Sequence, residues 1–479
     1  MKRLAAGTEL DGFRIGACLH AGGMAHIYEV TYADERAAPF AMVMKVPRMT
    51  AGDGAENIVG FEVEHQILQV LHGTHVPRFV AAGDLVSLPY LVMEHVQGLT
   101  LQQMLDAHTH DHTRATVPEM SRLGAAIARA AHSLHQQNTC HLDLKPANVL
   151  LHPDGHAVLL DFGLSCHAHY PDLLAEELRK AVGSPAWIAP EQVVGVRGDP
   201  RSDIFAIGVM LYELATGELP FGNPQTNGGM RQRLWMDPTP PRRLRDDVPE
   251  WLQEVVLRCL EPEAAKRYPS AAHLVFDLEH PEQIKVTQRG QQIQGTPFFT
   301  HVKRWLKAAG MHYQPSPLPS QQIDEVPILM VAVPHHEASD ATLYSLRQAV
   351  ARSLGIRPGA RLAVVTVISP NLSSTSEHDK SETTLHRQYR TMLQQWAQPL
   401  DLDDHQTSYH VLEASDVANA LVRYAEGNNV SMIVMGAATH GLQMQRFVAT
   451  VPIKVAMEAP CTVILVKQSL PFELLNGSS

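Results

Sequence analysis

Cysteine is scarce in this chain, and the few cysteines form no recognisable framework. Five occur among 479 residues, and no two have the spacing of a CxxC pair. A disulfide framework and a structural zinc site both need paired or closely spaced cysteines, so neither is expected. This cysteine usage favours a reducing compartment, and we expect a cytoplasmic protein.

Long hydrophobic runs and an excess of positive charge are also missing. No run reaches the roughly 18 apolar residues that a membrane-crossing helix needs, so no transmembrane span is expected. The formal net charge is −11. An acidic balance argues against nucleic acid as a partner, because binding to phosphates favours a basic face.

The first 280 residues contain a small strand-rich part followed by a larger helical part. Short strands with a glycine-rich turn are expected over 12–46, and a buried strand over 90–96. Apolar residues at helical spacing predict helices over 60–71, 120–136, 202–216 and 251–260.

A segment of different composition, residues 281–324, follows this part. PSPLPSQQ at 315–322 is typical of a linker, since proline stiffens it and little of it can be buried. The stretch 298–310, FFTHVKRWLKAAG, places apolar residues beside lysine and arginine. We favour a helix that packs on one of the domains; a basic amphipathic helix that touches a membrane surface is the alternative.

From residue 326 the pattern changes again. The strand-like runs ILMVAV, RLAVVTVI, SMIVMG and TVILVK alternate with helical stretches near 341–353, 384–396, 416–426 and 446–457. Alternating strands and helices predict a parallel sheet that is covered on both faces.

Two segments near the start carry the first candidate site residues. Lys45 lies in the apolar run AMVMKVP, where an unpaired charge is costly, and Glu64 on the next predicted helix is a suitable partner. A surface lysine at a strand end is the alternative. In LHAGGMAHIY, Gly22 and Gly23 allow backbone N–H groups to approach phosphate oxygens, although glycine pairs also mark ordinary turns.

A third segment, HLDLKPANVL, gathers reactive side chains. Asp143 is able to accept a proton from a hydroxyl, Lys145 to neutralise a phosphate, and the Asn148 carboxamide to bind magnesium. Pro146 breaks any helix, so these groups lie on a loop. Asp161, in the sequence DFG, supplies a second oxygen ligand for a metal ion.

The combination of motifs resembles the eukaryotic-like Ser/Thr protein kinases of bacteria over residues 10–280. The matching segments, in family order, are GGMA, VMEHVQGLTL, HLDLKPANVL, DFGL, GSPAWIAPEQ, SDIFAIGVMLYELATGELPF and CLEPEAAKRYPSA. The resemblance implies a two-lobed α+β kinase fold, with the N-terminal lobe over 10–96 and the C-terminal lobe over 97–280.

The resemblance also implies the role of each catalytic residue. Lys45 holds the α- and β-phosphates of ATP and pairs with Glu64, and Asp143 is the catalytic base. Lys145 contacts the γ-phosphate. The implied ligands of Mg²⁺, for which Mn²⁺ is a substitute, are Asn148 and Asp161.

Further residues are implied to bind the nucleotide or to support the fold. Ile27 and Leu150 sandwich the adenine, Met93 guards the back of the pocket, and the Glu94–Val96 backbone binds the adenine edge. The full nucleotide-binding set is Gly22, Gly23, Ile27, Lys45, Met93, Glu94, Val96 and Leu150. The implied structural residues are the ion pair Glu191–Arg267 and the loop anchor Asp203. The Lys145–Pro146 pair fits Ser/Thr kinases rather than Tyr kinases.

The chain departs from the family at several positions. His20 replaces the first glycine of the loop, Ala25 replaces the third, and Val43 narrows the adenine pocket. Leu142 replaces the arginine that docks a phosphate on the activation loop, and that loop offers Ser165, Tyr170 and Ser184 as its few hydroxyls. We therefore predict that activity does not depend on activation-loop phosphorylation through an arginine clamp.

Residues 325–470 resemble the universal stress protein family, an open Rossmann-like α/β fold of five parallel strands. Many members bind ATP through a glycine-rich loop, but only Gly436 and the hydroxyl residue Thr450 match it here. Thr439 and Ala449 stand at the two positions where the family has its other glycines, and Pro334 replaces an aspartate. A nucleotide sensor and a degenerate docking or dimerisation domain are the two hypotheses. We favour the second, because lost glycines prevent close backbone approach to phosphate.

Together these observations predict a Ser/Thr protein kinase that phosphorylates proteins, including itself, with ATP and Mg²⁺. A homodimer through the C-terminal domain is expected from the family alone. The alternative is a pseudokinase, a nucleotide-binding scaffold, and His20 is its best support.

Overall fold

The computed structural model describes residues 4–22, 25–48, 55–83, 88–170, 172–174, 183–295, 327–335, 340–354, 360–368, 380–400, 402, 405–437 and 451–467. The chain divides into two compact units, residues 1–321 and 322–479, and each is described by itself. The segment 298–310, for which two interpretations were open, lies outside the described residues.

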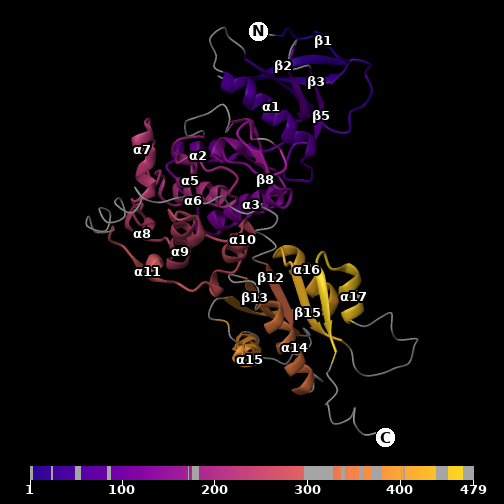
Figure 1. Cartoon of the computed structure of the whole chain (residues 1–479), viewed down its shortest axis with the longest axis vertical. Helices are drawn as coiled ribbons and strands as arrows, with labels where there is room; N and C mark the ends of the chain where they lie inside the picture. Colours follow the sequence, from indigo (N-terminus) through magenta and orange to yellow (C-terminus); the bar gives the residue numbers. More distant parts are fainter. Residues whose placement is uncertain are drawn as a thin grey trace. The chain divides into compact units, whose positions relative to one another are not determined.

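The first part of unit 1 is an antiparallel sheet in the order β1-β2-β3-β4-β6-β5, with helix α1 beside it (Figure 1). Its elements are β1 (Glu9–Leu10), β2 (Phe13–Ala21), β3 (Ala25–Tyr32), β4 (Met42–Pro47), α1 (Ala55–Val70), β5 (Phe79–Ala82) and β6 (Leu91–Glu94). Strands β2 and β3 are paired as far as Ala21, and His20 lies opposite Ile27.

The alternation of side chains along β4 explains why Lys45 points toward α1. Successive side chains of a strand point to opposite faces. Met42, Met44 and Val46 pack into a hydrophobic cluster with residues of β2 and β3, whereas Val43 belongs to the larger core that includes residues of α1. Lys45 shares the face of Val43, and its side chain therefore reaches toward α1.

The rest of unit 1 is mainly helical. Its main helices are α2 (Leu101–His110), α3 (Val117–Gln136), α5 (Pro190–Val193), α6 (Arg201–Thr216), α7 (Asn227–Arg231), α8 (Pro241–Leu244), α9 (Glu250–Cys259), α10 (Ala271–Glu279) and α11 (Gln288–Gln291). Thr116 caps the start of α3 with Glu119 in a capping box. Gly217, in the left-handed conformation, ends α6. These residues determine where α3 begins and where α6 ends.

Several short strands and one turn lie in or beside the segment HLDLKPANVL and the DFG segment. These elements are β7 (Leu99–Thr100), β8 (Thr139–Cys140), the 3₁₀ turn η1 (Pro146–Asn148), β9 (Val149–Leu151), β10 (Ala157–Leu159) and β11 (Cys166–His167). The order of one small sheet is β10-β9-β7, and β11 pairs with β8 in another. This arrangement is the two-lobed fold that the resemblance to protein kinases implies.

The packing of unit 1 continues past residue 280. The remaining turns are η2 (Gln232–Leu234), η3 (Ala264–Lys266) and η4 (Pro281–Gln283). Helix α11 packs on α9, where the Gln253 side chain donates to the Arg289 and Gly290 carbonyl oxygens at 3.0 Å each. Residues up to about 292 are therefore integrated with the helical lobe.

Unit 2 is a parallel sheet in the order β14-β13-β12-β15-β16 with helices around it (Figure 1). Its elements are β12 (Ile328–Ala332), α14 (Asp340–Leu354), β13 (Arg361–Ile368), α15 (Lys380–Ala397), β14 (Gln406–Glu413), α16 (Val417–Gly427), β15 (Met432–Gly436), α17 (Val451–Glu458) and β16 (Thr462–Val466). All eight residues of β13 are buried. The expected open α/β fold is confirmed.

The expected elements differ from the observed ones in two places. Strand β14, with sequence QTSYHVLE, is absent from the four apolar runs of the sequence because polar residues alternate along this edge strand. The last helix was expected near 446–457, and its described part is α17. Within the described residues, no helix is long and apolar enough to cross a membrane.

Candidate active site

Lys45 lies at the centre of the site, between two carboxylates. Its Nζ is 2.6 Å from Glu64 Oε2 on α1 and 3.0 Å from Asp161 Oδ1. Gly60 allows this approach, because a Cβ there would be 3.2 Å from the Gly163 carbonyl oxygen. The helix, the strand and the DFG segment are thus drawn together as the sequence predicts.

The charges of this group support one another. Burial opposes the charge of Lys45, but the attraction of Glu64 and Asp161 outweighs it and raises the pKa of the ammonium. The Lys45 ammonium lowers the pKa of Asp161 to about 2, so this carboxylate is ionised. Burial raises the pKa of Glu64 against the opposing effect of Lys45. The cluster therefore combines one cation with an ionised aspartate.

A second group of side chains lies on the loop after β8. Lys145 Nζ donates to Asp143 Oδ2 at 2.8 Å and to Ser184 Oγ at 3.0 Å. The Ser184 N–H donates to Asp143 Oδ1 at 2.8 Å. The Asn148 Nδ2 atom donates to the Asp143 carbonyl at 3.0 Å. Asp143 is thus held in one orientation by three residues.

The two groups are neighbours. The Leu160 N–H donates to the Asn148 carbonyl oxygen at 2.9 Å, which joins the segment before Asp161 to the loop. The charge of Lys145 also contributes to the lowered pKa of Asp161. Lys45, Glu64, Asp143, Lys145, Asn148 and Asp161 therefore converge, as the sequence predicts.

Asp203 on α6 anchors the loop that follows β8. Its carboxylate accepts from the His141 N–H at 2.9 Å, the Leu142 N–H at 2.8 Å and His135 Nε2 at 2.9 Å. Burial alone would raise the pKa of Asp203, but the hydrogen bonds and charges of His135 and His141 outweigh it and lower that pKa. The anchor role that the resemblance implies for Asp203 agrees with this geometry.

Two residues of the site have a strained backbone. Leu142 and Asp161 have φ angles of 62° and 64°, in the left-handed region that side chains disfavour. Such conformations cost about 1–3 kcal/mol each and persist where surrounding contacts hold them. The Asp203 carboxylate holds Leu142, and Lys45 holds Asp161.

The residues expected around the adenine lie on strands β3, β6 and β9 and just after β6. Ile27 is opposite Lys45 in the β3–β4 pairing, and Met93 is opposite Val43. The His95 N–H, within the Glu94–Val96 segment, donates to the Ala41 carbonyl at 2.8 Å.

The backbone at Gly98 is packed closely against Leu150 and Leu151. Leu150, on β9, lies beside this glycine, which has φ +146°. A Cβ at residue 98 would lie 2.2 Å from the Leu151 carbonyl oxygen, so only glycine fits. Gly22 N–H bonds to the Ala25 carbonyl at 3.0 Å, and Gly23 lies outside the described residues.

The donor set fits a magnesium ion. The two side-chain hydrogen bonds described for Asn148 both use Nδ2, so neither of them occupies its carboxamide oxygen. Asp161 supplies an ionised carboxylate on the neighbouring segment. Hard oxygen ligands in small number, completed by phosphate oxygens, are what Mg²⁺ prefers.

The activation segment is held at its start by hydrogen bonds that need no phosphate. The Ser165 hydroxyl is buried and donates to the His141 carbonyl at 3.1 Å. Arg197 donates to the Leu164 carbonyl at 2.8 Å and to Asp172 Oδ2 at 2.7 Å. The Ser165 bond ties the segment to the catalytic loop, and the Arg197 bonds tie it to the chain that follows α5.

We expect Tyr170→Phe to keep wild-type phosphotransferase activity, within about twofold, because Tyr170 is exposed and its replacement touches no core contact. Ser165→Ala should also retain activity, whereas Ser165→Asp should lose it by burying a charge. Steady-state kinetics of the purified variants measure this. Loss of activity in the Phe or Ala variant with recovery in the acidic one would contradict the prediction.

A buried ion pair supports the helical lobe. Arg267 is bidentate to Glu191, with distances of 2.7 and 2.8 Å, and Ser202 Oγ donates to Glu191 at 2.6 Å. Both charged side chains are almost fully buried. The pair joins α5 to the segment before α10, as the resemblance implies.

Some positioning residues carry no signal that the sequence alone would single out. Gln192 donates from Nε2 to the Leu142 carbonyl at 2.8 Å, and His135 bonds to Asp203. Arg197 clamps the activation segment. Each is a single polar residue whose partner is remote in sequence, so no local pattern identifies it.

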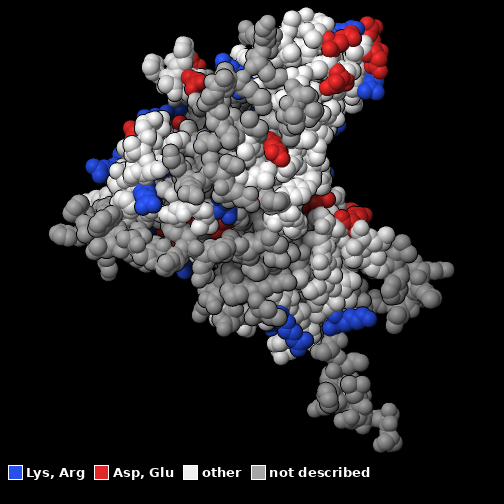
Figure 2. All heavy atoms as spheres, turned by 45° about the horizontal axis from the view of Figure 1, so that its top comes forward, with Lys and Arg blue, Asp and Glu red and all other residues white. Residues whose placement is uncertain are grey.

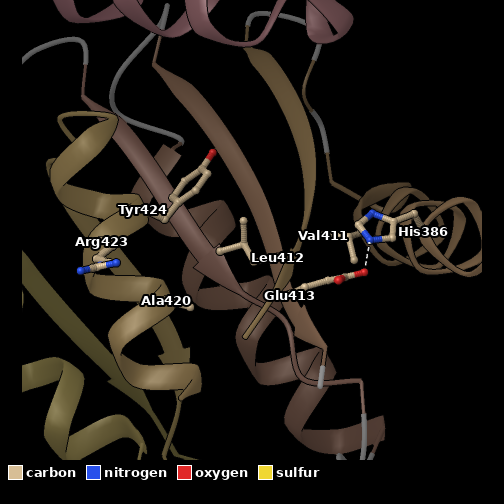
Figure 3. A pocket seen from close by; sticks show the side chains of 7 residues that line it. All are labelled: His386, Val411, Leu412, Glu413, Ala420, Arg423 and Tyr424. Atoms are coloured by element: carbon tan, nitrogen blue, oxygen red, sulfur yellow. Dashed lines mark hydrogen bonds and ion pairs between the residues drawn. The ribbon is translucent and has the colours of Figure 1, made fainter. Parts of the chain in front are cut away.

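Unit 2 contains a hollow of its own (Figure 3). It has a volume of about 740 Å³ and lies between α15, α16 and the end of β14. His386 Nε2 and Glu413 Oε1 are 2.7 Å apart on one side of it. The complete lining is His386, Val411, Leu412, Glu413, Ala420, Arg423 and Tyr424. The sequence did not predict this hollow.

The predicted nucleotide loop of unit 2 is described only in part. Gly436 ends β15 and Pro334 follows β12. Thr439, Ala449 and Thr450 lie outside the described residues. Whether this loop binds nucleotide therefore stays a hypothesis.

Charged side chains are scattered on the face drawn in Figure 2. On strand β2, Arg14 pairs with Glu9 at 3.2 Å and with Glu35 at 3.4 Å. Exposed pairs of this kind contribute about 0–1 kcal/mol. The absence of a nucleic-acid partner stays a prediction.

Comparison with known proteins identifies both parts of the chain. The family model for the protein kinase domain matches residues 15–277, and that for the universal stress protein family matches residues 328–467. The serine/threonine-protein kinase PrkC of Bacillus subtilis is 26% identical over 274 residues, 57% of this chain and 41% of that protein. PknB of Mycolicibacterium smegmatis is 30% identical over 275 residues, 56% of this chain and 42% of that protein.

These matches cover well under two thirds of the relatives' own length. The crystal structure of the Mycobacterium tuberculosis PknI kinase domain aligns at 22% identity with a TM-score of 0.45, covering 58% of this chain and 99% of that one. The kinase model matches more than half of the chain. The chain therefore belongs to the protein kinase family, with a universal stress protein domain behind the kinase domain.

Proposed function

We propose that this chain is an active Ser/Thr protein kinase, which transfers the γ-phosphate of ATP to hydroxyls of proteins and of itself. One observation carries the proposal: Lys45 is in contact with both Glu64 and Asp161, next to a loop that presents Asp143, Lys145 and Asn148. Its relatives PrkC and PknB are named serine/threonine-protein kinases.

In this mechanism the side chains of the site position the reacting groups and neutralise their charge. The Asp143 carboxylate orients the substrate hydroxyl and accepts its proton, while Lys145 neutralises charge on the transferring phosphate. Lys45 holds the two inner phosphates. Asn148 and Asp161 would hold Mg²⁺, which neutralises phosphate oxygens when bound. Catalysis is then mainly positioning and electrostatic stabilisation.

The rival hypothesis of a pseudokinase rests on His20 in the glycine loop. This residue is exposed near the end of β2 and is still paired with Ile27, although the register of the two strands shifts between Cys18 and His20. All four residues that phosphoryl transfer needs, Lys45, Asp143, Asn148 and Asp161, are retained and brought together. We therefore place the protein among the catalytically active kinases.

A transfer assay tests the proposal. Purified full-length protein receives γ-labelled ATP with Mg²⁺, and acid hydrolysis of the products identifies the labelled amino acids. We expect label on phosphoserine and phosphothreonine, and none when EDTA removes the metal. Protein that binds Mg-ATP but incorporates no label into itself or into added Ser/Thr substrates would support the pseudokinase instead.

For unit 2 we propose a docking or dimerisation role. In the described sheet β16 is an edge strand, and Leu465 on it is exposed. An edge strand offers backbone groups for pairing with a second chain. We also propose a cytoplasmic location, in line with the cysteine usage.

A further inference from the structure

Two cysteines lie directly opposite each other beside the active site. Cys140 on β8 and Cys166 on β11 are Cα partners in an antiparallel pair. The Ala168 N–H donates to the Asn138 carbonyl at 2.9 Å, two residues further along the same ladder. Hydrogen-bonded pairs recur every second residue, so Cys140 and Cys166 form such a pair, with Cα atoms about 5.5 Å apart.

That separation is suitable for a disulfide. Cα atoms of bonded cysteines are usually about 4.4–6.8 Å apart, most often near 5.5–6 Å. Because the two residues are directly opposite each other, their side chains also lie on the same side of the ribbon. The backbone therefore needs no rearrangement to allow the bond.

The two thiols differ in their access to solvent. Cys140 is fully buried, and burial raises the pKa of its thiol. Cys166 is half-buried and reachable from solvent. An oxidant therefore meets Cys166 first, and Cys140 is placed to react second.

The position of the pair connects it to catalysis. Cys140 immediately precedes His141 and the loop with Asp143, and Cys166 immediately follows Ser165 in the segment that begins at Asp161. A bond between them would close a ring that contains the catalytic loop and the DFG segment. No other cysteine lies within either of these segments.

We propose that Cys140 and Cys166 form a reversible disulfide in response to peroxide, and that this bond locks the catalytic loop to the start of the activation segment. This inference goes beyond the proposed kinase activity, because formation of the bond requires no catalysis. In a reducing compartment such bonds are transient and serve as sensors.

The chemistry balances with hydrogen peroxide as the oxidant. The Cys166 sulfur attacks one peroxide oxygen, the O–O bond breaks, and a sulfenic acid and one water result. The Cys140 sulfur then attacks the Cys166 sulfur and forms the S–S bond. The S–O bond breaks, and the oxygen leaves as a second water with the proton of Cys140. Two thiols lose two electrons, and the peroxide is reduced to two waters.

The bond should preserve the assembled site. It joins residues that already pair, and it retains the hydrogen bond from the Ser165 hydroxyl to the His141 carbonyl. Cross-linking also restricts the unfolded chain, which stabilises the folded one. We expect oxidised protein to keep its activity and to unfold at a temperature higher by about 5 °C.

The test uses the full chain. The protein is treated with hydrogen peroxide, remaining thiols are alkylated, and the protein is digested without reductant for mass spectrometry. We expect a linked peptide that contains Cys140 and Cys166, a raised unfolding temperature, and reversal of both by dithiothreitol. Cys259→Ala, which removes another buried cysteine, is the matched control and should behave as wild type.

Two results would overturn the proposal. One is oxidation of Cys166 to sulfinic or sulfonic acid while Cys140 stays a free thiol. The other is a linked peptide or a rise in unfolding temperature that persists in Cys166→Ser. Because the linked peptide is sought in the wild-type protein, the result does not depend on the variants folding. Protein without kinase activity that forms the bond would refute only the proposed function.

Discussion

Asp143→Asn is expected to lower kcat for phosphate transfer by about 10²- to 10⁴-fold, the range that loss of a positioned base produces. Asp143 is buried and accepts from Lys145 Nζ and from the Ser184 N–H. The amide has nearly the same shape, but it accepts no proton and presents N–H donors toward the Lys145 ammonium. Steady-state kinetics and Mg-ATP titration of the variant measure the effect, and affinity for Mg-ATP should change little.

Ser184→Ala is the matched control for this prediction. It removes the hydroxyl that Lys145 contacts at 3.0 Å but keeps the backbone N–H bond to Asp143. Its activity should fall far less than that of the Asn variant. Transfer by Asp143→Asn at nearly the wild-type rate would mean that this carboxylate is not the base.

Lys45→Met is expected to reduce kcat by about 10²- to 10³-fold, as removal of a preorganised electrostatic donor does. The variant also leaves Glu64 buried without its cation. Breaking a buried pair by removing one partner costs about 3–5 kcal/mol. The raised pKa of Glu64 allows this carboxyl to take up a proton, so the loss in free energy of unfolding should lie at or below the lower end of that range.

A double variant separates the two roles of Lys45. In Lys45→Met/Glu64→Gln the buried carboxylate is neutral, so part of the lost free energy of unfolding should return. Activity should not return, because no ammonium faces the phosphates. Urea unfolding and steady-state kinetics of the three proteins provide the measurement. Recovery of activity in the double variant would show that Lys45 acts through Glu64 alone.

Much of the site is predictable from the sequence because its residues lie in short motifs. HLDLKPANVL and DFG place Asp143, Asn148 and Asp161 at fixed spacing, and Lys45 is the single charge in an apolar run. These groups are required by the chemistry, so their types alone point to phosphate and metal. The strongest helices, such as α3 and α6, carry apolar periodicity that indicates their extent to within a few residues.

The contacts that support the site are not predictable in the same way. Gln192 reaches the Leu142 carbonyl across 50 residues, and Arg197 reaches the Leu164 carbonyl across 33. Such bonds depend on the fold as a whole, and a lone glutamine or arginine has no local signature. The pairing of Cys140 with Cys166 is similar, since it follows from strand register and not from spacing. The hydrophobic pattern did not predict strand β14, because its position at the edge of the sheet permits polar residues.

The central claim is that a metal-bound triphosphate lies between Lys45, Asn148 and Asp161, and its most direct test is calorimetric titration with ATP, with and without Mg²⁺. In the wild-type protein we expect Mg²⁺ to tighten ATP binding at least about tenfold, equivalent to about 1.4 kcal/mol. In Asp161→Asn this gain should largely disappear. An equal effect of Mg²⁺ on both proteins would contradict the account.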